Sequence, residues 1–243
     1  MGANTNEGEK KVCRGEAALL LAVVINSLGV VLMLYSGSGI SAISSVPYAF
    51  SEIFPALSLG TWTYIFQGLL VLSLMVLRRR FVVQYLGSFV VGFLFSEMLD
   101  VHEMWIGILP GGLWWRVLYF IVSYLLISFG IALSNRCLLP IIPTDLFPRE
   151  LSQIIGKGYP RVKIAFDVIC LAITAGMTFA FLGRLDGLGV GTVVAAFTMG
   201  KAVGLMGNWL DRRFRFVSFL SQRQERRQEC FRRPAPAGGK HGK

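Results

Sequence analysis

Residues 17–36 read AALLLAVVINSLGVVLMLYS, a run of 20 residues without a charged side chain. An α-helix needs about 20 mostly apolar residues to cross the roughly 30 Å hydrocarbon core of a bilayer. In that core each backbone N–H and C=O must find its partner within the segment, and a helix provides these partners. The run therefore predicts a membrane-spanning helix near the start of the chain.

Similar runs recur along the chain, which has 243 residues, 54% of them hydrophobic and only 16% charged. This composition is typical of a membrane protein and not of a soluble domain. The sequence lacks the alternating segments of about 10 residues that a membrane β-barrel requires. We expect an all-α polytopic membrane protein with six transmembrane helices. The spans are predicted at 17–36, 59–77, 81–100, 114–135, 162–183 and 189–210.

The distribution of basic residues predicts the orientation of the spans. With the N-terminus in the cytoplasm, 21 of the 24 Lys and Arg residues lie in cytoplasmic segments, as the positive-inside rule requires. Both termini are therefore expected in the cytoplasm. The chain divides into a cytoplasmic N-terminus over 1–16, a single membrane domain over 17–211 and a basic cytoplasmic tail over 212–243.

The two halves of the membrane domain resemble each other in order. Identical residues recur 101 positions apart, and further matches follow after a slip of one residue. The pairs include Gly29 with Gly130, Pro47 with Pro148, Ser51 with Ser152 and, after the slip, Gln67 with Asp167. Because three spans is an odd number, the second copy enters the membrane upside down. We expect two inverted three-helix repeats, over about 17–100 and 114–211; the alternative is a duplication that only builds a scaffold.

Each half contains a connection that is too apolar for a solvated loop, at 38–58 and at 138–160. Prolines interrupt both segments, with Pro47 in the first and Pro143 and Pro148 in the second. Broken segments at matching positions of two repeats are typical of a midplane binding site. We therefore expect short broken or re-entrant helices between spans 1 and 2 and between spans 4 and 5. Helices lying flat on the membrane surface are the alternative.

Charged side chains inside the spans need a partner or a role, since each costs at least about 2.5 kcal/mol on insertion scales. Asp167 lies early in the fifth span and Lys201 near the middle of the sixth, and we expect them to form an ion pair. Gly200 and Gly204 have a spacing that lets two helices approach closely. Alternatively, Lys201 is a counter-charge for an anionic ligand, or Asp167 carries a proton or a cation.

Two further polar residues complete the candidate site. Gln67 occupies the position equivalent to Asp167, and Asp145 follows Pro143 at the start of a predicted short helix. Capping of that helix by Thr144 or Asp145 is the structural alternative. The substrate-binding residues that we expect are Gln67, Asp145, Asp167 and Lys201.

Other chemistries find little support in the sequence. Glu97, Asp100, His102 and Glu103 cluster at the outer end of the third span, but such side chains at a membrane surface are usually hydrated, and we expect no metal. The sequence contains no catalytic triad, HExxH motif or nucleotide-binding glycine loop, so we expect neither an enzyme nor a cofactor. The four cysteines lack CxxC spacing, which argues against metal clusters and disulfides.

The tail contains RRFRF and ten basic residues in all. This pattern is typical of a basic amphipathic helix on the inner leaflet, where anionic lipid attracts each cation by about 1 kcal/mol. We therefore expect the lipid bilayer and its anionic lipids as partners, and no nucleic acid.

The second half also carries a family resemblance. IPTDLFPRELS over 142–152, RVKIAFD over 161–167, Gly191 and Lys201 together resemble the YczE/YyaS/YitT family of bacterial membrane proteins. The matching residues of the first half are Gly60, Thr61 and Gln67. The likeness covers about residues 17–211. It implies a multi-pass protein of the bacterial cytoplasmic (inner) membrane, without a settled activity.

These observations favour a small-solute or ion transporter with a midplane site between the two repeats. The alternative is a membrane scaffold or regulatory protein that binds a protein partner and transports nothing.

Overall fold

The computed structural model describes residues 11–79 and 83–217, and most of these residues are helical. The long helices are α1 (Gly15–Tyr35), α3 (Leu59–Arg78), α4 (Val83–Ile106), α5 (Leu113–Ser134), α7 (Tyr159–Leu182) and α8 (Val190–Arg213). The two connections hold the short segments η1 (Ala42–Ser44), α2 (Ser45–Ile53) and α6 (Pro143–Ile155). The all-α prediction is thus confirmed for the described residues.

The six predicted spans coincide with the six long helices, and the largest difference is at α4, which continues to Ile106. Five of them, α1, α3, α5, α7 and α8, are long and apolar enough to cross a membrane. The exception, α4, carries Glu97, Asp100 and Glu103 in its last ten residues. The five apolar helices indicate membrane insertion.

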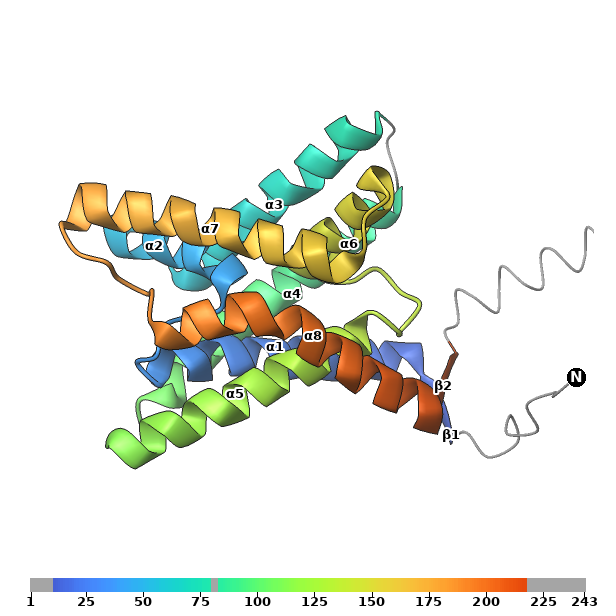
Figure 1. Cartoon of the computed structure of the whole chain (residues 1–243), viewed down its shortest axis with the longest axis horizontal. Coiled ribbons are helices and arrows are strands. Elements are labelled where there is room, and N and C mark those ends of the chain that lie inside the picture. Colours follow the sequence, from blue (N-terminus) through green and yellow to red (C-terminus); the bar gives the residue numbers. More distant parts are fainter. Residues whose placement is uncertain (1–10, 80–82, 218–243) are drawn as a thin grey trace, which may run out of the picture.

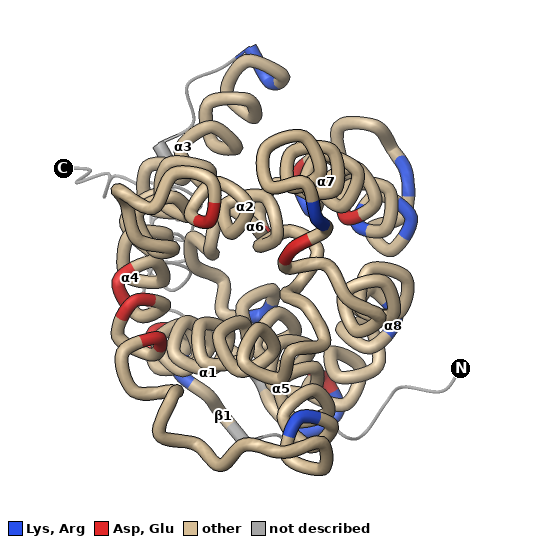
Figure 2. The backbone as a smooth tube through the Cα atoms, turned by 90° about the vertical axis from the view of Figure 1, so that its left-hand side faces the viewer, with Lys and Arg blue, Asp and Glu red and all other residues tan. Residues whose placement is uncertain are grey.

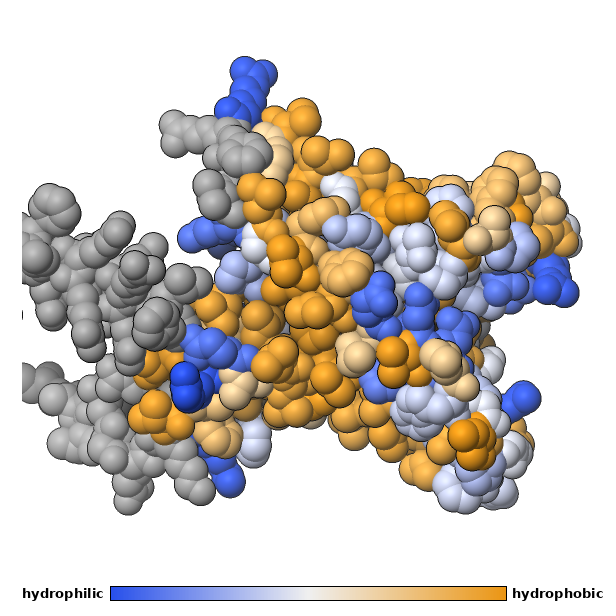
Figure 3. All heavy atoms as spheres, turned by 180° about the vertical axis from the view of Figure 1, so that it is seen from behind, coloured by the Kyte–Doolittle hydropathy of each residue, from blue (hydrophilic) through white to orange (hydrophobic). Residues whose placement is uncertain are grey.

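Large apolar side chains face outward along these helices. Leu69 and Val76 of α3, Phe179 of α7 and Leu205 of α8 are all more than half exposed. Figure 3 shows an apolar surface over the middle of one face, with hydrophilic residues gathered toward the two ends. Soluble monomers rarely expose apolar patches larger than a few hundred Å². A surface of this kind is suited to contact with lipid.

Helices α1 and α5 pack side by side and run in opposite directions (Figure 1). Helix α1 also packs against α4, and α5 against α8, while α3 packs against α4 and α7 against α8. In a view along the helices, the long helices follow one another around the circumference and α2 and α6 lie toward the inside (Figure 2).

Two glycines allow α1 and α5 to approach closely. A Cβ atom on Gly29 of α1 would lie 2.7 Å from Cγ1 of Ile127 on α5. A Cβ atom on Gly130 of α5 would lie 2.2 Å from Oδ1 of Asn26 on α1. Small residues at such a crossing bring the backbones of two membrane helices into contact. The two helices are therefore tightly packed against each other.

The short helices α2 and α6 both pack against α3 and α7, and they lie at opposite ends of the molecule (Figure 1). The first turn of α2, from Ser45 to Pro47, is buried, as is the first half of α6, from Pro143 to Pro148. These turns reach into the helical assembly and do not lie on the protein surface. The prediction of short helices in the two connections is confirmed.

The chain after α8 differs from the prediction of a helical tail. Phe214–Val217 forms strand β2, which pairs in parallel with β1 (Lys11–Arg14). The sequence FRFV contains two phenylalanines and a β-branched valine, residue types that favour a strand. Residues 218–243 of the predicted tail lie outside the described residues. The pairing places the start of α1 and the end of α8 at the same end of the molecule.

Candidate functional site

A central cavity of about 40 Å³ lies among the helices. Its wall combines residues of α1, η1, α4, α5, α7 and α8 with the start of α6, so both broken connections contribute to it. Its polar lining residues are Asn26, Ser41, Ser44, Thr144, Asp145, Lys163 and Asp167. Since a buried water needs roughly 10–15 Å³ of such space, the cavity holds a few water molecules or one small ion.

Asp145 lies in the first turn of α6 and is only 5% exposed. The N-cap position of α6 is occupied by Ile142, and no side chain caps the helix. The interpretation of Thr144 or Asp145 as a cap is therefore wrong, because both residues lie inside the first turn and not before it. Their side chains line the cavity instead. The positive end of the α6 dipole favours a negative charge at this position.

Lys163 and Asp167 form a buried ion pair on α7. The Lys163 Nζ atom lies 2.5 Å from Asp167 Oδ1, and the two side chains are 4% and 2% exposed. The expected pair between Asp167 and Lys201 is wrong, because Lys163 sits one helical turn from Asp167 and reaches it along the same helix. Lys201 is exposed on α8 and is not part of the cavity wall. The i,i+4 spacing of Lys163 and Asp167 was the sequence signal for the true pair.

Gln67 is fully buried on α3 but does not line the cavity. Its amide packs against Gly92 of α4, where a Cβ atom would lie 2.0 Å from Gln67 Oε1 and 3.0 Å from Pro143 Cδ. Neither amide atom of Gln67 has a hydrogen-bond partner among the described residues. The structure therefore places Gln67 beside the start of α6, and of the four predicted site residues it brings only Asp145 and Asp167 together in the cavity wall.

The glycine pair of α8 contributes less to packing than expected. A Cβ atom on Gly200 would make an ordinary contact of 3.5 Å with Cα of Pro160 at the start of α7. A Cβ atom on Gly204 would meet no atom within 4 Å. The expected close approach through both glycines is thus not present, and only Gly200 faces α7.

Asn26 is a cavity residue that the sequence reasoning missed. It lies in the middle of α1, is 4% exposed, and its Oδ1 atom has no hydrogen-bond donor among the described residues. Ser41 and Ser44 of the first connection also line the cavity and are hydrogen-bonded to each other at 2.9 Å. The signal for Asn26 was its presence as the only amide in an otherwise apolar span.

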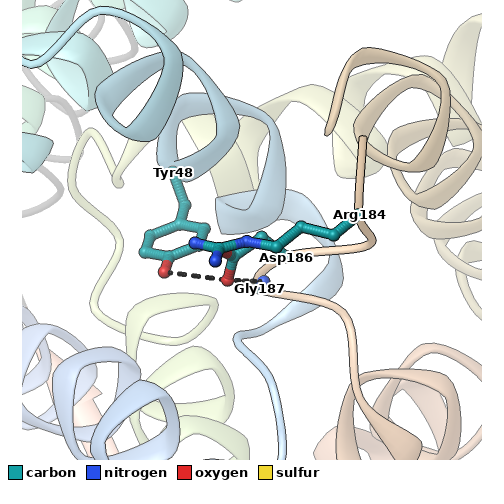
Figure 4. A network of polar contacts seen from close by, with 4 residues as sticks. All are labelled: Tyr48, Arg184, Asp186 and Gly187. Atoms are coloured by element: carbon teal, nitrogen blue, oxygen red, sulfur yellow. Dashed lines mark hydrogen bonds and ion pairs between the residues drawn. The ribbon is translucent and has the colours of Figure 1, made fainter. Parts of the chain in front are cut away.

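At one end of the molecule α2 is held by the loop between α7 and α8 (Figure 4). The Tyr48 hydroxyl donates to Asp186 Oδ1 at 3.5 Å, and the Arg184 guanidinium pairs with Asp186 Oδ2 at 2.8 Å. A Cβ atom on Gly187 would lie 2.4 Å from the Tyr48 ring, so the ring lies directly on the loop backbone. We name this group, Tyr48 with Arg184, Asp186 and Gly187, the Tyr48 cluster. Burial, followed by the nearby carboxylates of Glu52 and Asp186, raises the pKa of Tyr48.

At the opposite end α6 is held by α3 and α4. The Tyr85 hydroxyl donates to Glu150 Oε2 at 2.8 Å, and Arg78 Nη2 lies 2.5 Å from the same oxygen. We name this group, Arg78 with Tyr85 and Glu150, the Tyr85 cluster. Each cluster thus attaches a short helix of one half of the chain to long helices or loops of the other half.

The acidic residues near the end of α4 serve a structural role. The Asp100 carboxylate accepts hydrogen bonds from the Ser58 hydroxyl at 2.6 Å and from the Gly60 N–H at 2.7 Å, at the start of α3. Within residues 11–79 and 83–217, no group of three His, Cys, Asp or Glu side chains is placed to hold a metal ion.

Comparisons with known proteins give one match. A model of a family of unknown function (DUF6198) matches residues 13–208, which span all the long helices except the end of α8. No curated protein and no solved structure matches the chain.

Proposed function

The chain belongs to DUF6198, a family of unknown function, and we propose that it is a membrane transporter of a small solute or ion that binds in the central cavity. The observation that carries this proposal is the content of the cavity wall, where Asp145, Lys163 and Asp167 are buried between the two broken connections. Ionisable groups buried within a membrane domain are costly and are typical of ion and substrate pathways.

The proposed fold has six spans in two inverted repeats, with α4 as the sixth span. Pairs of contacts that exchange between the halves support this arrangement. Gly29 of α1 contacts Ile127 of α5, and Gly130 of α5 contacts Asn26 of α1. Gly130 lies 101 positions after Gly29, and Ile127 lies 101 positions after Asn26, so the second contact is the first with the two halves exchanged. The same spacing separates the start of η1 at Ala42 from the start of α6 at Pro143.

The ends of the cavity support the same symmetry. A Cβ atom on Gly39 would lie 2.5 Å from the N atom of Gly189, just before α8, while a Cβ atom on Gly87 of α4 would lie 2.7 Å from Cγ of Pro140. Gly39 and Pro140 are 101 residues apart, and Gly87 and Gly189 are 102 apart. In each case the segment before a short helix of one half meets the start of the third long helix of the other half.

The Tyr48 cluster and the Tyr85 cluster are the proposed closures of the cavity. One lies at the α2 end of the molecule and the other at the α6 end, and both join the two halves. If one closure opens while the other stays shut, the cavity communicates with one side of the membrane at a time. Both clusters are formed in the structure, so both proposed closures are shut in it.

The orientation belongs to the same proposal. The β1–β2 pair places the N-terminal and C-terminal ends of the described chain together. On the positive-inside rule we propose that this end faces the cytoplasm and that the Tyr48 cluster lies on the outer side, in the bacterial inner membrane that the family resemblance implies. Arg212 and Arg213 at the end of α8 then face anionic lipid of the inner leaflet. Kinship with the YczE/YyaS/YitT family remains a prediction.

The second candidate function is a scaffold or regulatory protein without transport activity. Its motivation is the basic tail, of which residues 218–243 lie outside the described residues. Neither candidate function involves an enzymatic activity. The two candidates differ in whether solvent reaches the cavity from both sides of the membrane.

Cysteine accessibility tests the proposed function without knowledge of the substrate. The four native cysteines are replaced by serine or alanine, and Ile43→Cys and Thr144→Cys are introduced one at a time, since both residues line the cavity at positions 101 apart. A membrane-impermeant thiol reagent is applied to intact cells and to inverted vesicles. Transport predicts that each cysteine reacts from both faces. Ile173→Cys on the exposed face of α7 is the control that should stay unreactive in lipid.

The labelling pattern decides between the two candidates. A cavity that reacts from one face only, or from neither, would favour the scaffold. The folded state of each variant is checked by size-exclusion chromatography in detergent, so that lost reactivity is not confused with unfolding.

A further inference from the structure

The carboxylate of Asp145 differs from the other buried acidic groups. Asp167 is paired with Lys163, and Glu150 is bound by Arg78 and Tyr85. Among the described residues, by contrast, the Asp145 carboxylate receives no hydrogen bond and forms no ion pair, although the residue is 95% buried and lines the cavity. A buried charge without a partner is strongly unfavourable, so this group must be neutralised.

The neighbouring charges do not neutralise it. Lys163 of α7 is engaged by Asp167, and Arg149 on α6 itself lies one helical turn away and is half-buried. Of the other titratable groups on α3, α4 and α7, which pack against α6, Tyr159 of α7 lies near enough to Asp145 to interact with its charge, and the Tyr85 cluster holds α6 at Glu150. The cavity residues from α1, η1, α4, α5 and α8 are not titratable. With Asp145 ionised, the cavity wall therefore carries a net charge of −1.

Resting on the proposed function, we propose that the ion handled at this site is a proton, which binds to and leaves the Asp145 carboxyl group from the central cavity. On binding, one Asp145 oxygen forms an O–H bond with a proton taken from water on one side of the membrane. On release, this bond breaks and the proton returns to water on the other side. The net charge of the cavity wall alternates between zero and −1.

Asn26 provides the complementary group. Its buried Oδ1 atom lacks a donor in the described structure, and a protonated carboxyl group supplies an O–H donor. The cavity has room for water, and one molecule would be able to link the two groups. The protonated state thus satisfies two buried groups that the ionised state leaves unpartnered.

A metal cation fits the site less well. Alkali ions require several oxygen ligands, whereas the Asp167 carboxylate is already paired with Lys163. The ammonium group of Lys163 in the same wall repels a second cation. Consistent with proton binding, burial raises the pKa of Asp145, on α6 between the spanning helices, to about 6, despite the opposing charges of Lys163 and Arg149.

Infrared difference spectroscopy on the purified full-length protein in lipid tests this inference. The carboxyl C=O band is followed between about pH 4 and 8 in the wild type, Asp145→Asn and the control Glu97→Gln, an exposed acid on α4. We expect a band with a midpoint near pH 6, compared with about pH 4 for an exposed aspartate. It should disappear in Asp145→Asn and remain in Glu97→Gln. Asp145→Glu, which keeps a titrating group, serves if Asp145→Asn fails to fold.

Two results would overturn the inference: a band near pH 6 that persists in folded Asp145→Asn, and the absence of any such band in the wild type. A third arm replaces choline chloride by sodium chloride at constant ionic strength and pH. Sodium-specific loss of the band would show that an alkali ion occupies the site and would also overturn it. Failure of the cysteine labelling with a normal Asp145 band would remove the transport function alone, so the two failures are distinguishable.

Discussion

The buried pair of Lys163 and Asp167 leads to a quantitative prediction for a double-mutant cycle. Removing one partner of a buried ion pair leaves an uncompensated charge and typically costs about 3–5 kcal/mol. Both side chains are almost completely buried here, so Asp167→Asn and Lys163→Met should each fall in this range.

The double variant Lys163→Met/Asp167→Leu should be close to the wild type in stability, since apolar residues of similar volume often replace a buried pair without loss. The losses of unfolding free energy in the two single variants sum to about 6 kcal/mol at the lower end of the range, whereas the loss in the double variant should be close to zero. The free energy of unfolding is measured in detergent by tryptophan fluorescence. A single change of about 3 kcal/mol should lower Tm by roughly 6–12 °C in a chain of this size.

Two matched variants make the cycle specific. Lys201→Gln should leave Tm almost unchanged, because Lys201 is exposed and Asp167 is already paired. Arg14→Gln removes the exposed Arg14–Glu16 pair and should cost less than about 1 kcal/mol. Additive losses in the double variant would refute the buried pair, as would a Lys201→Gln effect as large as that of Lys163→Met.

Three further predictions follow from the packing and the charges. Gly39 has φ +100°, and a Cβ atom there would lie 2.0 Å from Thr192 Oγ1, so Gly39→Ala should destabilise the protein by more than about 1 kcal/mol. Gly176 lies in open space on α7, so Gly176→Ala should stabilise the protein by about 0.5–1 kcal/mol. Thermal unfolding measures both variants, and equal effects would contradict the close contact at Gly39. Tyr85→Phe should cost about 1.5–3 kcal/mol, because Glu150 loses a hydrogen-bond donor. The Tyr64 hydroxyl has no hydrogen bond among the described residues, so Tyr64→Phe should be neutral in the same assay. A neutral Tyr85→Phe would argue against the Tyr85 cluster. Because the pKa of Asp145 is raised in the folded state, the contribution of Asp145 to the free energy of unfolding is complete below about pH 4 and is lost as the pH rises through about 6. The free energy of unfolding should therefore decrease over this range in the wild type and decrease less in Asp145→Asn. The same pH profile in both proteins would show that Asp145 ionises normally.

The long helices could be predicted from the sequence because a membrane imposes one simple rule, a sustained apolar run of fixed length. The short helices at Pro47 and Pro143 were also predictable, since proline interrupts an apolar segment in a recognisable way. The paired strands at Lys11–Arg14 and Phe214–Val217 were not, because each is only four residues long and forms through a contact between the two ends of the chain.

The candidate site was harder to predict than the fold. Asp145 and Asp167 stood out as charges within apolar surroundings, and both lie in the cavity wall. Lys201 is equally conspicuous in the sequence but faces outward. Its orientation could not be predicted, because the sequence does not specify which face of α8 meets α7. Asn26 was overlooked because it carries no charge, and its significance depends on the rotation of α1 toward the cavity, which the sequence does not specify.

The central claim is that the two closures of the cavity open in turn, and distances between spin labels test it most directly. One pair of labels, at Ser51 and Leu185, reports on the Tyr48 cluster, and a second pair, at Gln84 and Gln153, reports on the Tyr85 cluster. Double electron–electron resonance is measured in lipid above and below about pH 6. The account predicts two distances for each pair, with one pair lengthening under the conditions in which the other shortens. One narrow, unchanging distance for both pairs would contradict alternating closure and leave a rigid scaffold.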